Sequence, residues 1–324
     1  MYDIIIIGLG CAAYTAAIYT ARYKLSTLIV GAEEGGMGIT AAEVGNWPGI
    51  IDIKGPDLME NFKKHALSYE GVEHRNAYVK KVELAGDLNR RLTGFRLTLE
   101  NGEIMEGKTV IFATGSEKRK LGIKGEKEFL RKGVTYCATC DAFFYKEKDV
   151  AVLGGGDAAV EGAAIAAQVC KTVYLIHRRK EFRAEPYWVD KVKEKKNIVF
   201  VLERNAVEIL GEEKVTGVKL DKGFEGKNVL PVAGVFIEIG ADPASKIAKE
   251  LGCDLDERNF VKVDEAMRTN VPGAFAAGDV TSGSNHFAQF ATAAGEGAVA
   301  ANSVFNYLQT GGEHGGGMHG GNNH

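Results

Sequence analysis

The stretch DIIIIGLGCAA, residues 3–13, decides the fold of this chain of 324 residues. Its four consecutive isoleucines predict that residues 3–7 form a strand buried in a parallel sheet. The letters GLGCAA at 8–13 fit the pattern G-x-G-x-x-A, and the alanine-rich residues 14–23 predict a helix directly after it. A strand, a glycine-rich loop and a helix in this order predict a unit that binds a dinucleotide.

Each small residue of the loop has its own purpose in such a unit. Gly8 permits the tight turn after the strand, and Gly10 lets a pyrophosphate approach the backbone at the start of the helix. Ala13 allows the helix to pack closely on the strand. A second strand is predicted next, and after it comes an acidic pair at the place where a carboxylate binds ribose hydroxyl groups, Glu33 and Glu34.

The same pattern occurs a second time in the chain. Residues 150–153 predict a strand, GGGDAA follows at 154–159, and a helical stretch comes next. The positions that match the first loop are Gly154, Gly156 and Ala159. The predicted class is therefore α/β, with two Rossmann-like dinucleotide-binding domains.

The second unit differs from the first in the charge that follows its second strand. Residues 172–176 predict that strand, which runs into the basic turn HRRKEFR at 177–183. The turn supplies His177, Arg178, Arg179 and Arg183. A cationic cluster at this place accommodates the 2′-phosphate of NADP, whereas the first site suits a cofactor with free ribose hydroxyl groups. Two such sites in one chain indicate hydride transfer between FAD and a nicotinamide.

Between the two units, YCATCDAFFY at 136–145 places Cys137 and Cys140 three positions apart, with Asp141 directly behind them. A structural zinc site needs four ligands and this stretch offers two, so no metal site is predicted. A static bridge across so short a loop removes little entropy from the unfolded chain. The interpretation that remains is a disulfide that opens and closes during turnover.

Other cysteines and the aromatic residues behind the pair are expected to have structural roles. The remaining thiols have apolar settings or adjoin a glycine loop, and we expect them to be buried and unpaired: Cys11, Cys170 and Cys253. The three aromatic residues that follow Asp141 are expected to pack at the base of their domain: Phe143, Phe144 and Tyr145.

Composition excludes several classes of protein. The formal net charge of -3 and the pI of about 6.2 argue against a nucleic-acid binder. No apolar stretch approaches the roughly 20 residues that span a bilayer, and the first residues do not have the pattern of a signal peptide. We therefore expect a cytoplasmic protein with no membrane partner. The glycine-rich tail at 311–324 is expected to be disordered, with no metal on its histidines.

Taken together, these motifs resemble those of the low-molecular-weight thioredoxin reductases, which are homodimeric FAD proteins. The likeness runs from residue 3 to about 308 and is carried, in order, by GLGCAA, EVGNWPG, FATG, CATCD, GGGDAAVEG, HRRKEFRAE and FAAGDV. The resemblance implies a FAD domain at 1–116 and 246–310, with an NADP domain at 117–245 inserted into it.

The resemblance also implies a reaction and roles for individual residues. Hydride would pass from NADPH to FAD, and the electrons would then open the cysteine disulfide and reduce a thioredoxin or a thioredoxin-like protein. Cys140 would face the flavin, Cys137 would attack the disulfide of the partner, and Asp141 would carry a proton. Three further residues stand at flavin contacts of the family: Asn46, Asp279 and Gln289.

The chain departs from the family pattern at Met37, Ala288 and Cys11, and none of these departures removes a catalytic group. Two alternatives remain open. One keeps the fold but takes electrons from ferredoxin or a deazaflavin, or passes them to a peroxiredoxin or a glutaredoxin-like protein. The other is a flavin-binding redox sensor without turnover. The intact GGGDAA and HRRKEFR segments favour NADPH as the donor.

Overall fold

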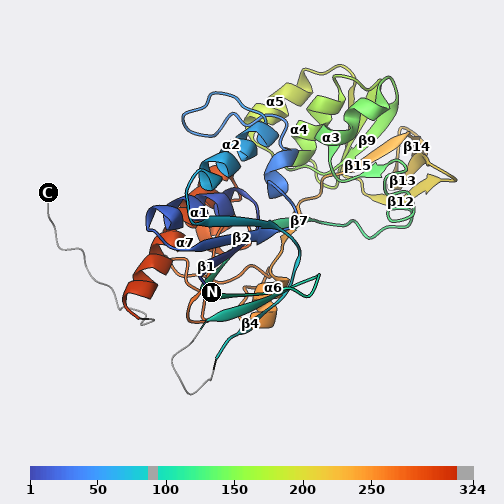
Figure 1. The fold of residues 1–324 in the computed structure, drawn as a ribbon. Helices are drawn as coiled ribbons and strands as arrows, with labels where there is room; N and C mark the ends of the chain where they lie inside the picture. The colour runs from blue at the N-terminus through green and yellow to red at the C-terminus, as the bar shows by residue number, and fades with distance from the viewer. Residues whose placement is uncertain (87–93, 312–324) are drawn as a thin grey trace. The chain divides into compact units, whose positions relative to one another are not determined.

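The computed structural model describes residues 1–86 and 94–311 of the chain. They form two compact units, and each is described below by itself. Unit 1 combines residues 1–117 with the described residues from 243 onward, and unit 2 comprises residues 118–242. Unit 2 is therefore inserted into the sequence of unit 1; it is the green and yellow part of the chain in Figure 1.

Unit 1 is built on a seven-stranded sheet in the order β3-β2-β1-β6-β5-β4, with β17 paired to β6. Strands β1, β2, β3, β6 and β17 are parallel, and β4 and β5 extend the sheet in antiparallel fashion. The strands are β1 (Tyr2–Ile7), β2 (Thr27–Gly31), β3 (Val72–Asn76), β4 (Val79–Leu84), β5 (Phe95–Leu99), β6 (Ile104–Phe112) and β17 (Ala274–Ala276).

The isoleucines of β1 are buried on both faces of this sheet, as predicted. Ile4 and Ile6 pack into a core with α1 and α7, while Ile5 and Ile7 pack into a second core on the opposite face. The helices of unit 1 are α1 (Cys11–Arg22), α2 (Gly55–Leu67), α6 (Lys246–Leu251) and α7 (Phe290–Gln309), with short 3-10 turns η1 (Gly36–Thr40) and η3 (Gly283–His286).

Helices α1 and α7 lie against each other, as Figure 1 shows. Their contact is close because Gly297 has no side chain: a Cβ atom there would lie 2.4 Å from the carbonyl oxygen of Ala12. The predicted helices at 14–23 and at about 288–309 are thereby confirmed as α1 and α7.

Unit 2 contains a parallel five-stranded sheet in the order β11-β10-β9-β15-β8 and an antiparallel three-stranded sheet, β12-β13-β14. Its strands are β8 (Val134–Thr135), β9 (Asp149–Leu153), β10 (Thr172–His177), β11 (Ile198–Leu202), β12 (Ala206–Gly211), β13 (Val215–Phe224), β14 (Lys227–Pro231) and β15 (Gly234–Ile237). Its helices are α3 (Ala138–Asp141), α4 (Asp157–Ala166) and α5 (Pro186–Lys193), with the 3-10 turn η2 (Ala142–Tyr145).

Alternate residues of β9 face two different cores, because successive side chains of a strand point to opposite faces. Val150 and Val152 pack with α4, while Ala151 and Leu153 pack with the three-stranded sheet. Each unit thus places a glycine-rich loop between a buried parallel strand and a helix. The predicted α/β class with two Rossmann-like domains is confirmed.

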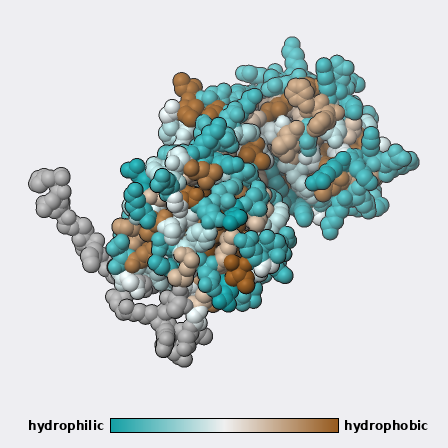
Figure 2. Space-filling model, in the orientation of Figure 1, coloured by the Kyte–Doolittle hydropathy of each residue, from teal (hydrophilic) through white to brown (hydrophobic). Residues whose placement is uncertain are grey.

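The two segments that join the units pair with each other as β7 (Ser116–Lys118) and β16 (Ala241–Pro243). The backbone N–H of Arg119 donates to the carbonyl oxygen of Gly240 at 3.0 Å, and that of Ala244 donates to Gly115 at 2.9 Å. Within the described residues, no helix is both long and apolar enough to cross a bilayer. The visible surface is largely hydrophilic, with separate apolar patches in both units (Figure 2).

Candidate active site

Unit 1 contains a cavity of about 730 Å³ at the carboxyl ends of its parallel strands. Residues that follow β1, β2, β6 and β17 all line it, which is where open α/β sheets bind their ligands. Five of the residues predicted to bind the flavin cofactor lie on its wall: Gly8, Gly10, Glu33, Asp279 and Gln289. The departures from the family pattern, Met37, Ala288 and Cys11, line the same cavity.

The two glycines of the first loop differ in what surrounds them. A Cβ atom on Gly8, whose φ is +131°, would lie 2.0 Å from the carbonyl oxygen of Ala113, so the fold itself requires glycine there. Around Gly10, apart from its neighbours in the chain, no described atom lies within 4 Å of the position of a Cβ atom. Open space at the start of a helix, next to a cavity, fits a phosphate group of a bound dinucleotide.

The structure separates the two glutamates that follow β2. Glu33 lines the cavity. Glu34 is not among the residues lining it; its carboxylate lies 2.7 Å from the ammonium of Lys63 and 3.2 Å from the imidazole of His74. The Lys63 ammonium is the main reason why the pKa of Glu34 is lowered. Of the remaining predicted residues, Ala13 is buried in α1, and Asn46 donates from Nδ2 to Oε1 of Gln289 at 3.0 Å.

Asp279 lies three residues beyond the end of β17 and is half-buried. Burial, together with the negative charge of Glu296, raises its pKa to about 6. The Glu296 carboxylate accepts hydrogen bonds from the backbone N–H of Gly278 and the hydroxyl group of Thr281, both at 2.8 Å. Glu296 therefore holds the loop that carries Asp279. Sequence reasoning missed it because, at its position on α7, nothing in the sequence marks it as different from a surface glutamate.

The second glycine-rich loop, in unit 2, repeats the arrangement of the first. A Cβ atom on Gly154, whose φ is +144°, would lie 2.1 Å from the carbonyl oxygen of Glu238. At Gly156, apart from its chain neighbours, no described atom comes within 4 Å of the position of a Cβ atom. Ala159 is fully buried on α4. The loop therefore leaves the same open position at the start of its helix.

The basic turn folds back onto this loop. The backbone N–H of Arg183 donates to the carbonyl oxygen of Gly155 at 2.7 Å, and the side chains of Arg178, Arg179 and Arg183 are exposed. His177 differs from the arginines: its ring is buried against Gly155, where a Cβ atom would lie 2.3 Å from it. Burial lowers the pKa of His177, so its ring is neutral near pH 7. Of the four residues predicted for this turn, the three arginines are therefore exposed to solvent and His177 is not.

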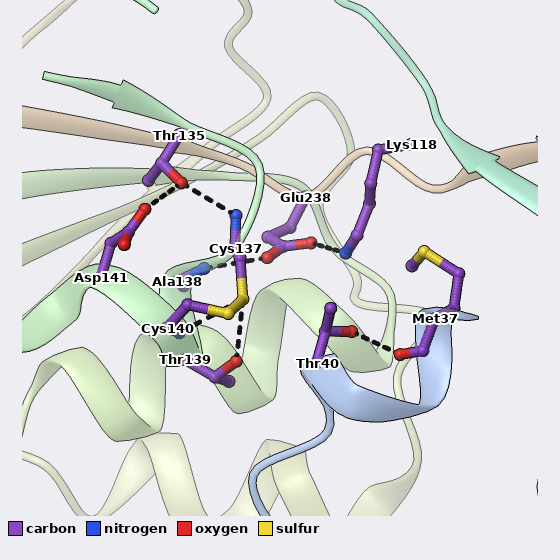
Figure 3. Close-up of a disulfide and its surroundings, with 10 residues drawn as sticks. All are labelled: Met37, Thr40, Lys118, Thr135, Cys137, Ala138, Thr139, Cys140, Asp141 and Glu238. Carbon is purple, nitrogen blue, oxygen red and sulfur yellow. Dashed lines mark hydrogen bonds and ion pairs between the residues drawn. A yellow bond between two sulfur atoms is a disulfide. The ribbon is translucent and has the colours of Figure 1, made fainter. Parts of the chain in front are cut away.

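Cys137 and Cys140 form a disulfide at the start of α3, and Figure 3 shows its surroundings. The backbone N–H of Cys140 donates to Sγ of Cys137 at 3.2 Å, and the hydroxyl group of Thr139 lies 3.2 Å from the same sulfur. Cys137 caps this short helix, and after reduction the hydrogen bond from the Cys140 amide favours its thiolate.

Asp141 is connected to the backbone in front of the disulfide through Thr135. The Thr135 hydroxyl group donates to Oδ2 of Asp141 and accepts the backbone N–H of Cys137 at 3.1 Å (Figure 3). One side chain therefore fixes the carboxylate of Asp141 relative to Cys137. The sequence offered no sign of this, because a threonine two residues before a cysteine is ordinary in a strand.

The other cysteines are buried and free, as predicted. Burial raises the pKa of Cys170 and of Cys253 to about 11, and that of Cys11 to about 12, so all three thiols stay protonated. Within the parts of the chain that the structure describes, no group of three or more His, Cys, Asp or Glu residues could hold a metal ion. Apart from Gly311, the tail predicted to be disordered lies outside the described residues, and so do its histidines, His314, His319 and His324.

The prediction that Phe143 and Phe144 pack at the base of their domain is wrong. Their side chains are 77% and 76% exposed. The reason is the 3-10 turn η2, in which residues three apart share a face. Ala142 and Tyr145 take the inner face, where Tyr145 packs edge-on against Phe236, and the two phenylalanines between them point outward.

A protein with two dinucleotide loops on separate units and a disulfide beside the second is, by fold and site, a nucleotide-dependent disulfide oxidoreductase. Comparison with known families agrees. The family described as pyridine nucleotide-disulphide oxidoreductase matches residues 2–297, and the chain belongs to this family.

Its relatives place it more narrowly, among the thioredoxin reductases, as the sequence motifs predicted. It is 38% identical over 314 residues to the thioredoxin reductase of Listeria innocua, covering 95% of this chain and 94% of that protein. Against the thioredoxin reductase of Streptomyces coelicolor the identity is 40% over 304 residues, with 92% and 91% covered. The crystal structure of Lactococcus lactis thioredoxin reductase superimposes with a TM-score of 0.88 at 34% identity, covering 96% of this chain and all of that one.

Proposed function

We propose that this chain reduces the disulfide of thioredoxin or a thioredoxin-like protein with electrons from NADPH, and that FAD bound in unit 1 carries them. The observation that supports this most directly is the disulfide between Cys137 and Cys140, formed at a helix start in the same unit as the second glycine-rich loop. The nicotinamide that supplies the electrons would bind in this same unit, and FAD bound in unit 1 would pass them to the disulfide.

The residues of each unit fit the cofactor we assign to it. In unit 1, the open position at Gly10 suits the pyrophosphate of FAD, and Glu33 on the cavity wall suits its ribose hydroxyl groups. In unit 2, the open position at Gly156 suits the pyrophosphate of NADPH, and the exposed arginines of the basic turn suit its 2′-phosphate. Bound FAD supplies the step that converts hydride from NADPH into an electron pair for the disulfide.

Opening the disulfide takes two electrons and two protons and leaves thiols on Cys137 and Cys140. The Cys137 thiolate then attacks the partner disulfide and forms a mixed disulfide with it. Cys140 attacks that bond, which restores the bond between Cys137 and Cys140 and releases the partner as a dithiol. We assign to Asp141 the movement of a proton in these steps, and its link through Thr135 to the Cys137 amide supports this role.

Two further parts of the proposal follow from the family resemblance. We place the enzyme in the cytoplasm, where a reducing environment keeps thiols such as Cys170 and Cys253 free. We also expect a homodimer, which light scattering of the purified protein measures directly.

The experiment that tests the function is an anaerobic titration of the purified flavoprotein, followed by the flavin absorbance. NADPH and NADH are added separately to the wild type and to a Cys140→Ser variant. NADPH should bleach the flavin at far lower concentration than NADH, and the wild type should take up two more electrons per subunit than the variant.

Two results would contradict the proposal. If neither nucleotide bleaches the flavin, the electrons come from another donor, such as ferredoxin. If the wild type and the variant take up the same number of electrons, the cysteine pair is not part of turnover, and a redox sensor becomes the better account.

A further inference from the structure

Unit 2 contains a buried carboxylate that the reaction outlined above does not use. Glu238 directly follows β15, and only 5% of its surface is exposed. A buried carboxylate is unfavourable unless it is paired and hydrogen-bonded. Glu238 has both kinds of partner: Lys118 donates from Nζ to Oε2 at 2.7 Å, and the backbone N–H of Ala138 donates to Oε1 at 3.0 Å (Figure 3).

These partners belong to elements that matter for the reaction. Ala138 is the first residue of α3 and stands between the two cysteines of the disulfide. Lys118 is the last residue of β7, where the chain enters unit 2. The carbonyl oxygen of Glu238 also lies against Gly154 in the second glycine-rich loop, 2.1 Å from where a Cβ atom would be. One residue therefore contacts the redox helix, the entering strand and the nucleotide loop.

The charge of Glu238 depends on Lys118. Burial raises the pKa of the Glu238 carboxyl group, and the ammonium of Lys118 acts in the opposite direction. A charge-assisted hydrogen bond of 2.7 Å between the two is the arrangement expected for an ionised pair. A negative charge is therefore held at the amino end of α3.

That charge opposes the hydrogen bond that would stabilise a Cys137 thiolate. The backbone N–H of Cys140 donates to Sγ of Cys137 at 3.2 Å, and after reduction such a donor favours the thiolate. Glu238 accepts the amide of Ala138, the residue next to Cys137, and so holds its negative charge near the place where that thiolate forms. Like charges close together disfavour each other.

We propose that Glu238 is a positioning residue that disfavours the reduced, ionised cysteine pair, and so keeps the dithiol ready to pass its electrons on. Lys118 maintains the charge of Glu238 in this role. The inference rests on the proposed function only in requiring that the pair open and close.

The test measures the equilibrium between the disulfide and the dithiol in the full-length flavoprotein. The protein is equilibrated with mixtures of reduced and oxidised dithiothreitol, thiols are trapped by alkylation, and Cys137 and Cys140 are quantified by mass spectrometry. In each exchange, dithiothreitol loses two electrons and two protons and closes into its cyclic disulfide, while the protein disulfide gains them and becomes two thiols.

The informative variant is Glu238→Gln, which keeps an oxygen for the Ala138 amide and removes the charge. We expect its equilibrium constant for reduction of the disulfide to rise roughly tenfold, because one nearby like charge is lost. A tenfold change corresponds to a reduction potential about 30 mV higher. The matched control is Glu208→Gln, because Glu208 pairs with Lys124 at 2.7 Å elsewhere in unit 2. The control should leave the equilibrium unchanged.

A second variant separates charge from folding. Lys118→Met combined with Glu238→Gln replaces the ion pair with a neutral pair, an exchange that often leaves stability intact. It should keep the shift toward the dithiol while unfolding near the wild-type temperature. A purely structural role for Glu238 would instead lower the unfolding temperature of the single variant and leave its equilibrium constant unchanged.

The proposal is overturned if Glu238→Gln matches the wild type and the control, or moves toward the disulfide. If the wild-type pair cannot be opened in any of the mixtures, the proposed function fails as well. If it opens normally and only the effect of Glu238 is missing, this inference alone is wrong.

Discussion

Replacing Gly156 with alanine should damage nucleotide binding and leave the fold intact. The backbone of Gly156 has φ -98° and ψ -177°, which any residue adopts. No described atom beyond its chain neighbours lies within 4 Å of the added Cβ atom. Alanine is a poorer helix cap than glycine, but it loses less conformational freedom on folding, so the free energy of unfolding should change by less than about 1 kcal/mol.

The methyl group would instead occupy the space that we assign to the pyrophosphate of NADPH. Crowding of a well-packed site by one methyl group costs roughly 1–3 kcal/mol, which corresponds to a roughly 5- to 150-fold weaker affinity. The matched control is Gly154→Ala, where φ is +144° and the new atom would lie 2.1 Å from the carbonyl oxygen of Glu238. Backbone strain and overpacking together should lower the stability of that variant by roughly 2–6 kcal/mol.

Two measurements on the same preparations separate these effects. Thermal unfolding reports the stability of the fold, and the NADPH concentration needed for half-maximal flavin bleaching under anaerobic conditions reports the nucleotide affinity. Flavin content serves as a check, since both substitutions lie in unit 2 and should leave it unchanged. The reasoning is refuted if Gly156→Ala unfolds as early as Gly154→Ala, or if it binds NADPH as well as the wild type.

Two further predictions concern unit 1. Gly10→Ala should keep the free energy of unfolding of the flavin-free protein within about 1 kcal/mol of the wild type, because the added atom meets no described residue beyond its neighbours. The same substitution should sharply reduce the ratio of flavin to protein absorbance after purification. An unchanged flavin content would show that this loop does not bind FAD. Asp279→Asn should change how the stability of the flavin-free protein depends on pH. The pKa of Asp279 is raised to about 6 in the folded chain, beside Glu296, so the stability contributed by its protonated form is present below about pH 4 and is lost as the pH rises through about 6. Relative to the wild type, the variant should therefore gain up to about 3 kcal/mol between those pH values, and parallel unfolding curves would contradict the assignment.

Sequence patterns predicted those parts of the fold that depend on the spacing of residues close together in the chain. The isoleucine run of β1, the glycine and alanine positions of both loops and the basic turn at 177–183 each lie within a few consecutive residues, and each forms the expected element. Glycine spacing is informative here because a tight turn and a close backbone approach admit almost no other residue.

Other features could not be predicted because they depend on the path of the chain through space. The carboxylate of Glu238 meets Ala138 and Lys118 from 100 and 120 residues away in the sequence. Glu33 and Glu34 are adjacent and chemically alike, and it is the positions of Lys63 on α2 and His74 on β3 that distinguish them. The outward direction of Phe143 and Phe144 depends on a 3-10 turn that begins directly after α3.

The pairing of β7 with β16 has a consequence for how such a chain can arise and be re-engineered. Because these two strands are hydrogen-bonded neighbours, residues 118–242 begin and end at adjacent points. The flanking segments of unit 1 are therefore joined as they would be by a short hairpin turn, and the length of the insert adds little to the entropic cost of bringing them together. Residues 118–242 therefore form a cassette whose termini a short peptide could join, either to circularise the excised cassette or to graft it into a surface turn of another protein.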